Sequence, residues 1–565
     1  MRTLIGMTAA VLIVGAPSSD REAIRPTTPP AGDSTERARA LHALNRLTYG
    51  PRPGDVDRVV ALGVDRWIEQ QLHPETMANE QLETQLPGFE ILEFTDDDLA
   101  AMFYRQQRER RQRQLAMRDS TQKMDAADRP AQRPRQRNQL GRLTGQFQQL
   151  AVTRAVVSEH QLYEVMVDFW TNHFNVFIRK GPLRYLTPHY IEYVIRPNAL
   201  GRFEDLLVAT AKSPAMLSYL DNAQSVAPGS TNPQLAQLER RLRQASNSRR
   251  GRGQGDRIRQ LERRLEQARE RSPRGLNENY ARELLELHTL GVDGGYTQDD
   301  VINVARILTG WSTSRPNQRS AKFVFNMWAH DETEKTVMGR TFSPAGSDEG
   351  VALLQMLARH PSTMRHVSRK LCMRFVSDDP PDGCVEAGAQ AWKRHDGDIR
   401  EVLRAVIASP EFWSPEVRGA KTKTPLEFVV SALRAVEATP DTVPGLAGLV
   451  ARLGQPLYTH QAPNGYPETQ EAWVNAGALL NRLNVALAFA AGRVPGAAVD
   501  HNRVVGLNHE LHDMVALVNE ALLNGTASPN TLRVMEEQAA QTANRRQARA
   551  MLIGYALGSP EFQRQ

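Results

Sequence analysis

Apolar residues recur at intervals of three or four over long stretches of the chain, the spacing that places them on one face of a helix. Four such stretches lie at 351–375, 399–407, 428–436 and 478–491. Helix-start signals stand among them. Ser213-Pro214 places a capping residue before a proline, and Thr424 and Glu427 have the spacing of a capping box. The pattern predicts an all-α, multi-helix body.

Strand-like patterns are sparse and short. Residues 322–326 and 336–338 carry the clearest ones, and we expect these two segments to pair as one small β-hairpin. This minor β element leaves the predicted fold class all-α.

A local repeat interrupts the helical body. Residues 237–242 and 260–265 both read Gln-Leu-Glu-Arg-Arg-Leu, and further apolar residues extend each copy at helical spacing. A stretch rich in Ser, Arg and Gly, over 246–255, separates the two copies. This arrangement predicts an arginine-rich antiparallel helical hairpin that projects from the body.

The composition is ordinary for a globular protein, with 41% apolar and 24% charged residues among 565, and it excludes a collagen-like or wholly disordered chain. The formal charge of +6 is uneven. Residues 104–140 hold 11 Lys and Arg against 4 Asp and Glu, and residues 226–274 hold 13 against 5. We therefore expect an acidic helical body over 39–495 with basic insertions at 104–142 and 226–274. A C-terminal helical segment, 496–565, would pack on this body.

The basic insertions leave two interpretations open. They could dock an anionic polymer or a cell surface, or they could be solvated insertions without a partner. Aromatic residues that would stack on bases are few in them, so we do not expect nucleic-acid binding.

The first residues have the composition of an export signal. Arg2 precedes a short apolar run over 4–14, and small residues follow. We predict a signal peptide over 1–19 and a disordered linker over 20–38, with a buried N-terminal helix as the alternative. The run is too short to span a bilayer. An exported protein, periplasmic or extracellular and without a transmembrane span, is expected.

The chain has two cysteines, which excludes a disulfide-dense scaffold and a four-cysteine metal site. Cys372 and Cys384 enclose a short loop, and a bridge between them would add roughly 3 kcal/mol of stability. Two buried free thiols are the alternative, because the sequence gives no Cα separation.

A polar stripe marks the most apolar helix predicted. Asp168, Thr171, Asn172 and Asn175 share one face, and aromatic residues fill the other faces. Such a helix is expected to be buried, so its polar stripe needs partners or a cleft. His173 lies on another face and is a candidate ligand or general base; a hydrogen-bonded core histidine is the alternative.

A second polar helix is predicted over 277–291. Two carboxylates one turn apart on a buried face, Glu283 and Glu286, can hold a metal or divide acid and base roles. A helix fixed by salt bridges to Arg282 is the alternative. The candidate acid–base groups or ligands are His173, Asp221, Glu278, Glu283, His330 and Asp331. These residues do not identify a cofactor. A divalent metal is the cofactor that such groups could hold.

Several ordered segments resemble the bacterial family called domain of unknown function 1800. They are 44–50, 168–175, 196–203, 213–222, 277–291, 310–311, 330–331, 374–380, 421–427 and 454–456. The resemblance runs from about Leu41 to about Ala491, with an extension to the C-terminus as the alternative, and the arginine-rich insertion falls where such proteins vary in length. It implies export and a genetic association with a second secreted family that resembles sulfatases and alkaline phosphatases, but no agreed reaction.

Two classes of function remain. The first is an extracytoplasmic hydrolase or metal-dependent enzyme that acts on a polysaccharide or another polymer. The second is a non-catalytic accessory or scaffold protein that works with the secreted sulfatase-like partner. In the second case the polar motifs would fix helix packing, and the basic insertions would dock the partner or a surface.

Overall fold

Helices begin in the structure at the residues where the sequence has capping signals. Thr424 caps helix α21 (Pro425–Ala435) in a reciprocal capping box with Glu427. Ser213 caps helix α11 (Pro214–Tyr219) by accepting a hydrogen bond from the backbone of Ala215. These local interactions satisfy backbone groups that would otherwise be orphaned at the helix start.

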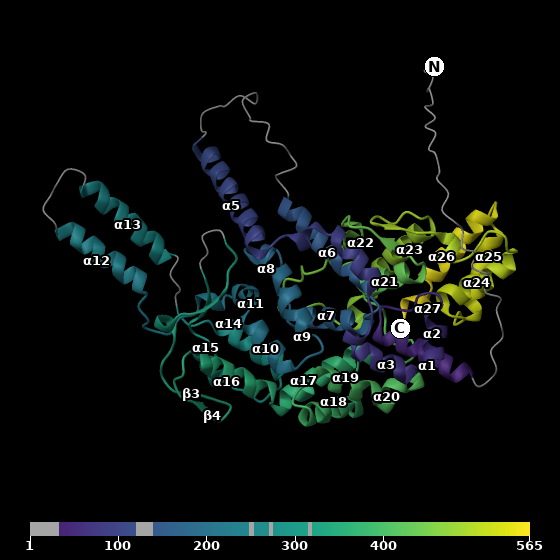
Figure 1. Cartoon of the computed structure of the whole chain (residues 1–565), viewed down its shortest axis with the longest axis horizontal. Coiled ribbons are helices and arrows are strands. Elements are labelled where there is room, and N and C mark those ends of the chain that lie inside the picture. Colours follow the sequence, from purple (N-terminus) through teal and green to yellow (C-terminus); the bar gives the residue numbers. More distant parts are fainter. Residues whose placement is uncertain (1–32, 120–138, 248–253, 271–274, 315–318) are drawn as a thin grey trace, which may run out of the picture.

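The computed structural model describes residues 33–119, 139–247, 254–270, 275–314 and 319–565. Helices dominate these residues, which confirms the all-α fold (Figure 1). The predicted signal peptide, 1–19, and most of the predicted linker lie outside the described residues. Helix α1 begins at Asp33, inside the range predicted as linker.

The helices fall into four consecutive groups along the chain. The first is α1 (Asp33–Leu47), α2 (Asp55–Leu62), α3 (Val64–Leu72), α4 (Glu80–Gln85), α5 (Asp96–Asp119) and α6 (Gln139–Val157). The second is α7 (Gln161–His173), α8 (Leu183–Tyr190), α9 (Arg196–Asn198), α10 (Phe203–Lys212), α11, α12 (Pro233–Asn247), α13 (Gln254–Glu270), α14 (Glu278–Glu283) and α15 (Gln298–Ile307). The third is α16 (Ser347–Ala358), α17 (Pro361–Phe375), α18 (Asp382–Arg394), α19 (Ile399–Ala408), α20 (Pro410–Trp413), α21, α22 (Gly445–Arg452) and α23 (Ala476–Ala490). The fourth is α24 (Leu511–Leu523), α25 (Pro529–Ala540), α26 (Arg545–Gly558) and α27 (Pro560–Gln563).

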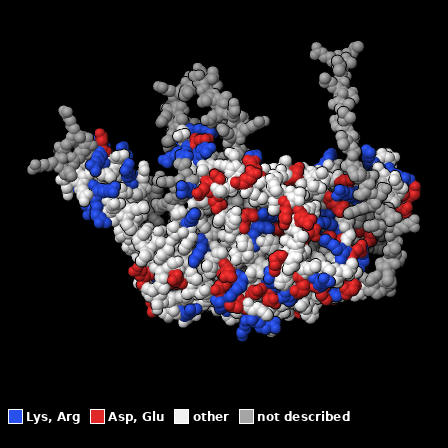
Figure 2. All heavy atoms as spheres, viewed as in Figure 1, with Lys and Arg blue, Asp and Glu red and all other residues white. Residues whose placement is uncertain are grey.

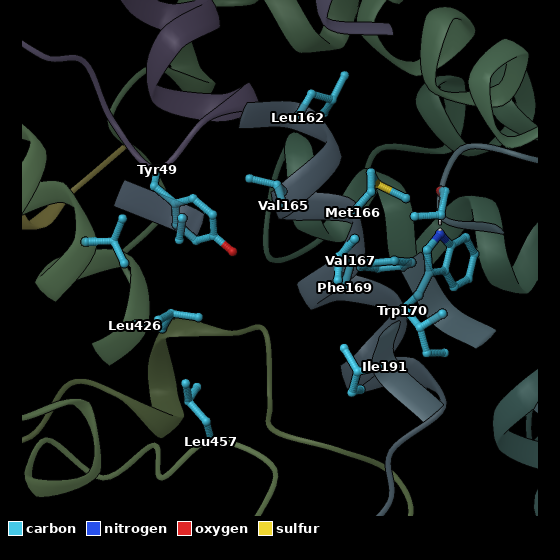
Figure 3. Packing of buried hydrophobic residues seen from close by; sticks show 14 of the residues in the cluster. Tyr49, Leu162, Val165, Met166, Val167, Phe169, Trp170, Ile191, Leu426 and Leu457 are labelled. Carbon is cyan, nitrogen blue, oxygen red and sulfur yellow. Dashed lines mark hydrogen bonds between the residues drawn. The ribbon is translucent and has the colours of Figure 1, made fainter. Parts of the chain in front are cut away.

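Helix α7 lies inside the body because most of its faces are apolar. Leu162, Val165, Met166 and Trp170 are buried in the core, and α7 packs against α1, α3 and α6 (Figure 3). The indole of Trp170 donates a hydrogen bond to the backbone oxygen of Ala199, so its one polar atom is satisfied. The remaining face of α7 carries Asp168, Thr171 and Asn172 of the predicted polar stripe; the helix ends at His173, so Asn175 lies just beyond it.

The strands differ from the predicted hairpin in how they pair. Residues 322–326 and 336–338 do contain strands, β2 (Phe323–Phe325) and β3 (Lys335–Val337). However, β2 pairs with β1 (Trp311–Thr313), and β3 pairs with β4 (Arg340–Phe342), so the predicted pairing is wrong.

The turn after β3 accounts for the pairing of β3 with β4. Met338 and Gly339 both have positive φ angles, as a two-residue hairpin turn requires, and they fold the chain directly back onto β4. A third antiparallel pair joins β5 (Thr439–Pro440) to β6 (Ala497–Ala498).

The repeated segment forms the predicted helical hairpin. Helices α12 and α13 pack against each other and project from the body (Figure 1). Arg269 on α13 pairs with Glu239 on α12 at 2.7 Å. The first basic insertion begins on α5, which also projects, and ends on α6.

Cys372 and Cys384 form a disulfide, so the free-thiol alternative is excluded. The bridge joins α17 to α18. At the C-terminal end, α26 packs against α23, and residues 563–565 pair with the backbone of Lys421 and Lys423. Among the described residues, no helix has both the length and the apolar character needed to cross a membrane.

Candidate functional site

Two small cavities adjoin along the polar face of α7. They offer about 40 and 30 Å³ of space, enough for a few water molecules or one small polar group. Both are lined by Asp168, Thr171, Leu457 and Tyr458, so they form two lobes of one cleft. We call this the Asp168 cleft. The polar stripe predicted from the sequence therefore does line a cavity.

Asp168 lies where the two lobes meet. It is half-buried, and its carboxyl group forms no hydrogen bond or ion pair with any residue that the structure describes. Burial raises the pKa of its carboxyl to about 7, against the opposing charge of Arg374 and with the support of Glu468 and Glu427. A carboxyl group with this pKa can hold or release a proton near neutral pH.

The first lobe contains two further ion pairs. The guanidinium of Arg196 donates to both oxygens of Glu164, each at 2.8 Å. Arg154 donates to both oxygens of Glu192, at 2.5 and 3.0 Å. Although burial opposes the shift, Arg196 holds the pKa of Glu164 below its usual range. Apolar contacts complete the wall, where Leu426 and Leu457 face α7 (Figure 3).

Arg374, on α17, organises the second lobe. Its guanidinium lies 2.5 Å from Glu427 Oε1 and 3.4 Å from Glu468 Oε2. Glu427 also accepts hydrogen bonds from the backbone of Thr424 and from the side chain of Gln565, at 2.7 and 2.9 Å. Arg374 is thus held by carboxylates on two other elements, with one face directed to the cleft.

The loop over 454–468 forms the outer wall and is fastened by two asparagines, Asn172 on α7 and Asn175 just after the end of α7. Asn172 accepts a hydrogen bond from the backbone N–H of Tyr466 and donates one to its carbonyl, at 2.6 and 2.8 Å. Asn175 donates to two more carbonyls of the loop, those of His460 and Ala462. These amides therefore position the wall.

Tyr458 holds a strained backbone conformation beside Asp168. Its φ angle is +60°, in the left-handed region that bulky residues rarely adopt. The carbonyl of Tyr458 accepts a hydrogen bond from Ile178, and its ring packs near Phe147 with a centroid distance of 5.2 Å. Strain of this kind persists only where the surroundings fix it, and it gathers at functional sites.

Among the residues that line the Asp168 cleft, positive and negative charges are equal in number when Asp168 is protonated, and Glu427 behind Arg374 adds a further negative charge. Each of the three arginines that line the cleft is paired with a carboxylate that also lines it. Ionisation of Asp168 adds one negative charge without a direct partner among the described residues. The cleft is therefore suited to an uncharged ligand.

The structure places His173 in the core. Its Nε2 lies 3.2 Å from the backbone oxygen of His288, and its Nδ1 lies 2.9 Å from Lys370 Nζ. Burial and the charge of Lys370 hold the pKa of His173 well below its usual value. Its ring also packs against Phe174, with centroids 4.5 Å apart. These are the contacts of the core-histidine alternative.

Asp221, Glu278 and Glu283 lie on or near the surface. Asp221 is exposed and pairs with Lys180 at 2.8 Å. Glu278 accepts a hydrogen bond from Gln298 at 2.8 Å. Glu283 is half-buried, and burial raises the pKa of its carboxyl.

His330 and Asp331 share one network next to β3. His330 lies 3.1 Å from Glu349, which also accepts a 2.7 Å hydrogen bond from Lys335. Asp331 accepts a 2.8 Å hydrogen bond from Arg306; although burial opposes the shift, this contact lowers the pKa of Asp331. The structure thus brings these two candidates together. It gives His173, Asp221 and Glu278 separate partners, and Glu283 forms no hydrogen bond or ion pair with the described residues. Among the described residues, no three His, Cys, Asp or Glu side chains are arranged to hold a metal ion.

The sequence contains signals at several residues of the cleft but none that indicates their chemical role. Asp168 was part of the polar stripe, and Arg374 and Glu427 lay in motifs of the family resemblance. Glu468 had no motif of its own. The signal that could have identified Asp168 is a charged residue inside an apolar helical pattern. Whether that residue has an ion-pair partner depends on side chains that are distant in the sequence, so the pattern alone does not show it.

Comparisons with known proteins agree with the resemblance. No curated protein and no solved structure matches the chain. The family described as "Protein of unknown function (DUF1800)" matches residues 42–564, which include α7, Arg374, Glu427 and Glu468. Since this match covers nearly the whole chain, the protein belongs to that family.

Proposed function

We propose that the Asp168 cleft is the active centre of a hydrolase that acts on an uncharged, hydroxyl-rich substrate such as a polysaccharide. The observation that carries this proposal is Asp168 itself, a carboxyl group with a pKa of about 7 that faces a cavity and has no direct partner among the described residues. A buried carboxyl group without a partner lowers the stability of the fold, and residues that are retained despite such a loss are typical of functional sites.

The proposed chemistry uses two carboxyl groups of the second lobe. Asp168 gives its proton to the leaving oxygen as the C–O bond breaks. A water molecule adds to the carbon and gives a proton to Glu468, which Arg374 and Asn172 hold in place. Paired carboxyl groups in different environments divide the acid and base roles in this way.

The size and charge of the cleft favour the substrate class. A space of this volume admits a few water molecules or one small polar group, so we expect the scissile oxygen and the attacking water to enter it rather than a whole sugar ring. The charge balance disfavours a substrate with its own charge. Thr171, Tyr458 and Tyr466 line the walls, and each carries a hydroxyl group that a sugar can hydrogen-bond. The hydroxyl of Tyr466 already donates to the Pro456 carbonyl, so it is left to act as an acceptor.

We propose in addition that the protein works outside the cytoplasm. The predicted signal peptide over 1–19 motivates this location. The disulfide between Cys372 and Cys384 supports it, because such bonds persist in oxidising compartments and are rare in the cytosol.

The test is release of reducing sugar from neutral oligosaccharides and neutral polysaccharides by the unaltered protein and by Asp168→Asn. We expect hydrolysis with the unaltered protein and a loss of at least about 100-fold in kcat with the variant, because general acid catalysis contributes roughly 10²–10⁴-fold. Asp205→Asn, at an exposed position of α10 outside the cleft, is the matched control and should keep full activity.

Two results would contradict the proposal. One is full hydrolysis by Asp168→Asn, which would place the proton donor elsewhere. The other is an unaltered protein that hydrolyses none of these substrates. That result would favour the non-catalytic role beside a sulfatase-like partner, with the cleft as a fixed polar core.

A further inference from the structure

The hairpin of α12 and α13 exposes arginines that have no acidic partner. Arg240 and Arg241 on α12, and Arg257 and Arg264 on α13, are exposed and form no ion pair with any residue that the structure describes. By contrast, Arg269 is neutralised by Glu239. Unpaired guanidinium groups on a projecting element create a positive potential that reaches solvent on several sides.

Helix α5 adds to this surface. Arg105, Arg110 and Arg111 are exposed and likewise form no ion pair with the described residues. In Figure 1, α5 and the α12–α13 hairpin project from the same side of the body, and Figure 2 shows Lys and Arg gathered on both. We call these seven arginines the basic arms. Elsewhere on this face, positive and negative side chains alternate (Figure 2).

The two helices of the hairpin pack against each other and are joined at their base. They turn their apolar residues toward each other, and Leu265 is buried between them. The backbone N–H of Val226 donates to the carbonyl of Gly275 at 3.1 Å, which closes the base of the hairpin. The other apolar residues of the two helices are half-buried, and among the described residues of the hairpin no large apolar side chain is exposed, which disfavours insertion into a membrane.

The residue types of the arms indicate the chemistry of a partner. The hairpin insertion, 226–274, contains thirteen arginines and no lysine. The planar guanidinium group of arginine binds carboxylate and sulfate groups through two parallel hydrogen bonds. The insertion also contains no aromatic residue, so it lacks the stacking platform that single-stranded nucleic acids use.

We infer that the basic arms bind an anionic polysaccharide, one that carries carboxylate or sulfate groups, and hold the protein on it. The inference is independent of the Asp168 cleft, whose charge balance favours an uncharged group. In this arrangement the arms bind one polymer while the cleft remains open to its own substrate.

The test is the affinity of the full chain for dextran sulfate and for polygalacturonate, measured at several salt concentrations. The variant replaces Arg240, Arg241, Arg257 and Arg264 with glutamine. The matched control replaces four exposed body arginines that lack ion pairs among the described residues, Arg66, Arg394, Arg452 and Arg493. We expect the arm variant to lose about 100-fold in affinity at low salt, and its salt dependence to be shallower by about three counterions. The control should bind within about twofold of the unaltered protein.

Equal binding by the arm variant and the control would overturn the inference, since it would show that net charge alone is responsible. Tighter binding to a 20-base-pair DNA duplex, or to vesicles of equal parts phosphatidylglycerol and phosphatidylcholine, would overturn it as well. Unchanged circular dichroism of both variants would show that they are folded. Retained binding to both glycans by an arm variant that is folded would place the anion site elsewhere.

Discussion

Glu164 and Asp168 stand one turn apart on α7, yet their surroundings give them opposite properties. Arg196 reaches Glu164 from another element and neutralises it. Asp168 has no such contact, and burial raises its pKa to about 7. The sequence predicted the polar face but could not tell these two carboxyls apart, because Arg196 and Arg374 come from distant segments. Contacts between elements, rather than local spacing, decide which carboxyl carries the proton.

Removal of the paired carboxyl should destabilise the fold. Glu164→Gln leaves the buried guanidinium of Arg196 without its charge partner, and we expect a loss of about 3 kcal/mol in the free energy of unfolding. Urea denaturation at pH 7 measures this. Glu69→Gln, which breaks an exposed pair with Arg404, is the control and should lose less than about 1 kcal/mol. Equal losses in the two variants would contradict the burial argument.

His288 offers the reverse case, a buried polar group whose removal should stabilise the fold. Its Nε2 has no partner among the described residues, and burial lowers the pKa of the ring to about 3. In His288→Phe this orphaned atom is gone, and we expect a gain of about 1–2 kcal/mol at pH 7.

The same variant has a pH signature. Between pH 6.5 and about 3, the unfolded chain binds a proton at His288 that the folded chain does not, so folded stability falls as pH falls. The advantage of His288→Phe should therefore grow by about 2 kcal/mol between pH 7 and pH 5. A gain that is equal at both pH values would show that His288 is not buried as a neutral ring.

At the scale of elements, local signals predicted helices well and strand partners poorly. The capping box at Thr424 and the repeat over 237–265 gave helices where expected. The segments around β2 and β3 were both recognised as strands, but each pairs with a neighbour that the pattern did not mark. Pairing followed the positive φ angles at Met338 and Gly339, a turn that the expected hairpin did not include.

The disulfide couples α17, which carries Arg374, to α18. Without the disulfide, the loop between the two cysteines is open in the unfolded chain, which therefore gains conformational entropy. We expect the double variant Cys372→Ala/Cys384→Ala to lose about 3 kcal/mol in the free energy of unfolding. Equilibrium unfolding in urea gives this value. Dithiothreitol should reproduce the loss in the unaltered protein and should leave the double variant unchanged. A variant as stable as the oxidised protein would contradict the expected contribution.

For the whole molecule, the sequence predicted an all-α body with a projecting basic hairpin, and the structure has both. It could not predict the Asp168 cleft, because the cleft forms where α7, α17, α21 and the loop over 454–468 meet. Such a meeting depends on long-range packing that no single segment encodes. The candidates chosen from the sequence alone do not line the cleft.

The hairpin should be separable from the body. Because Val226 and Gly275 already lie together, we expect that replacement of residues 228–274 with a short Gly-Ser linker leaves the body folded. The melting temperature should change by less than about 2 °C, as scanning calorimetry would show. A fall of more than about 5 °C would mean that the hairpin is part of the core.

The central claim is that Asp168 holds a proton near neutral pH because the cleft leaves it without a partner. The most direct test is the free energy of unfolding of the unaltered protein and of Asp168→Asn from pH 4 to pH 8. Above pH 4 the unfolded carboxyl loses its proton while the folded one keeps it up to about pH 7, so this group lowers stability as pH rises. Asp168→Asn should match the unaltered protein at pH 4 and exceed it by about 2–4 kcal/mol at pH 8. A difference that does not change with pH, or a variant that is less stable at pH 8, would contradict the account.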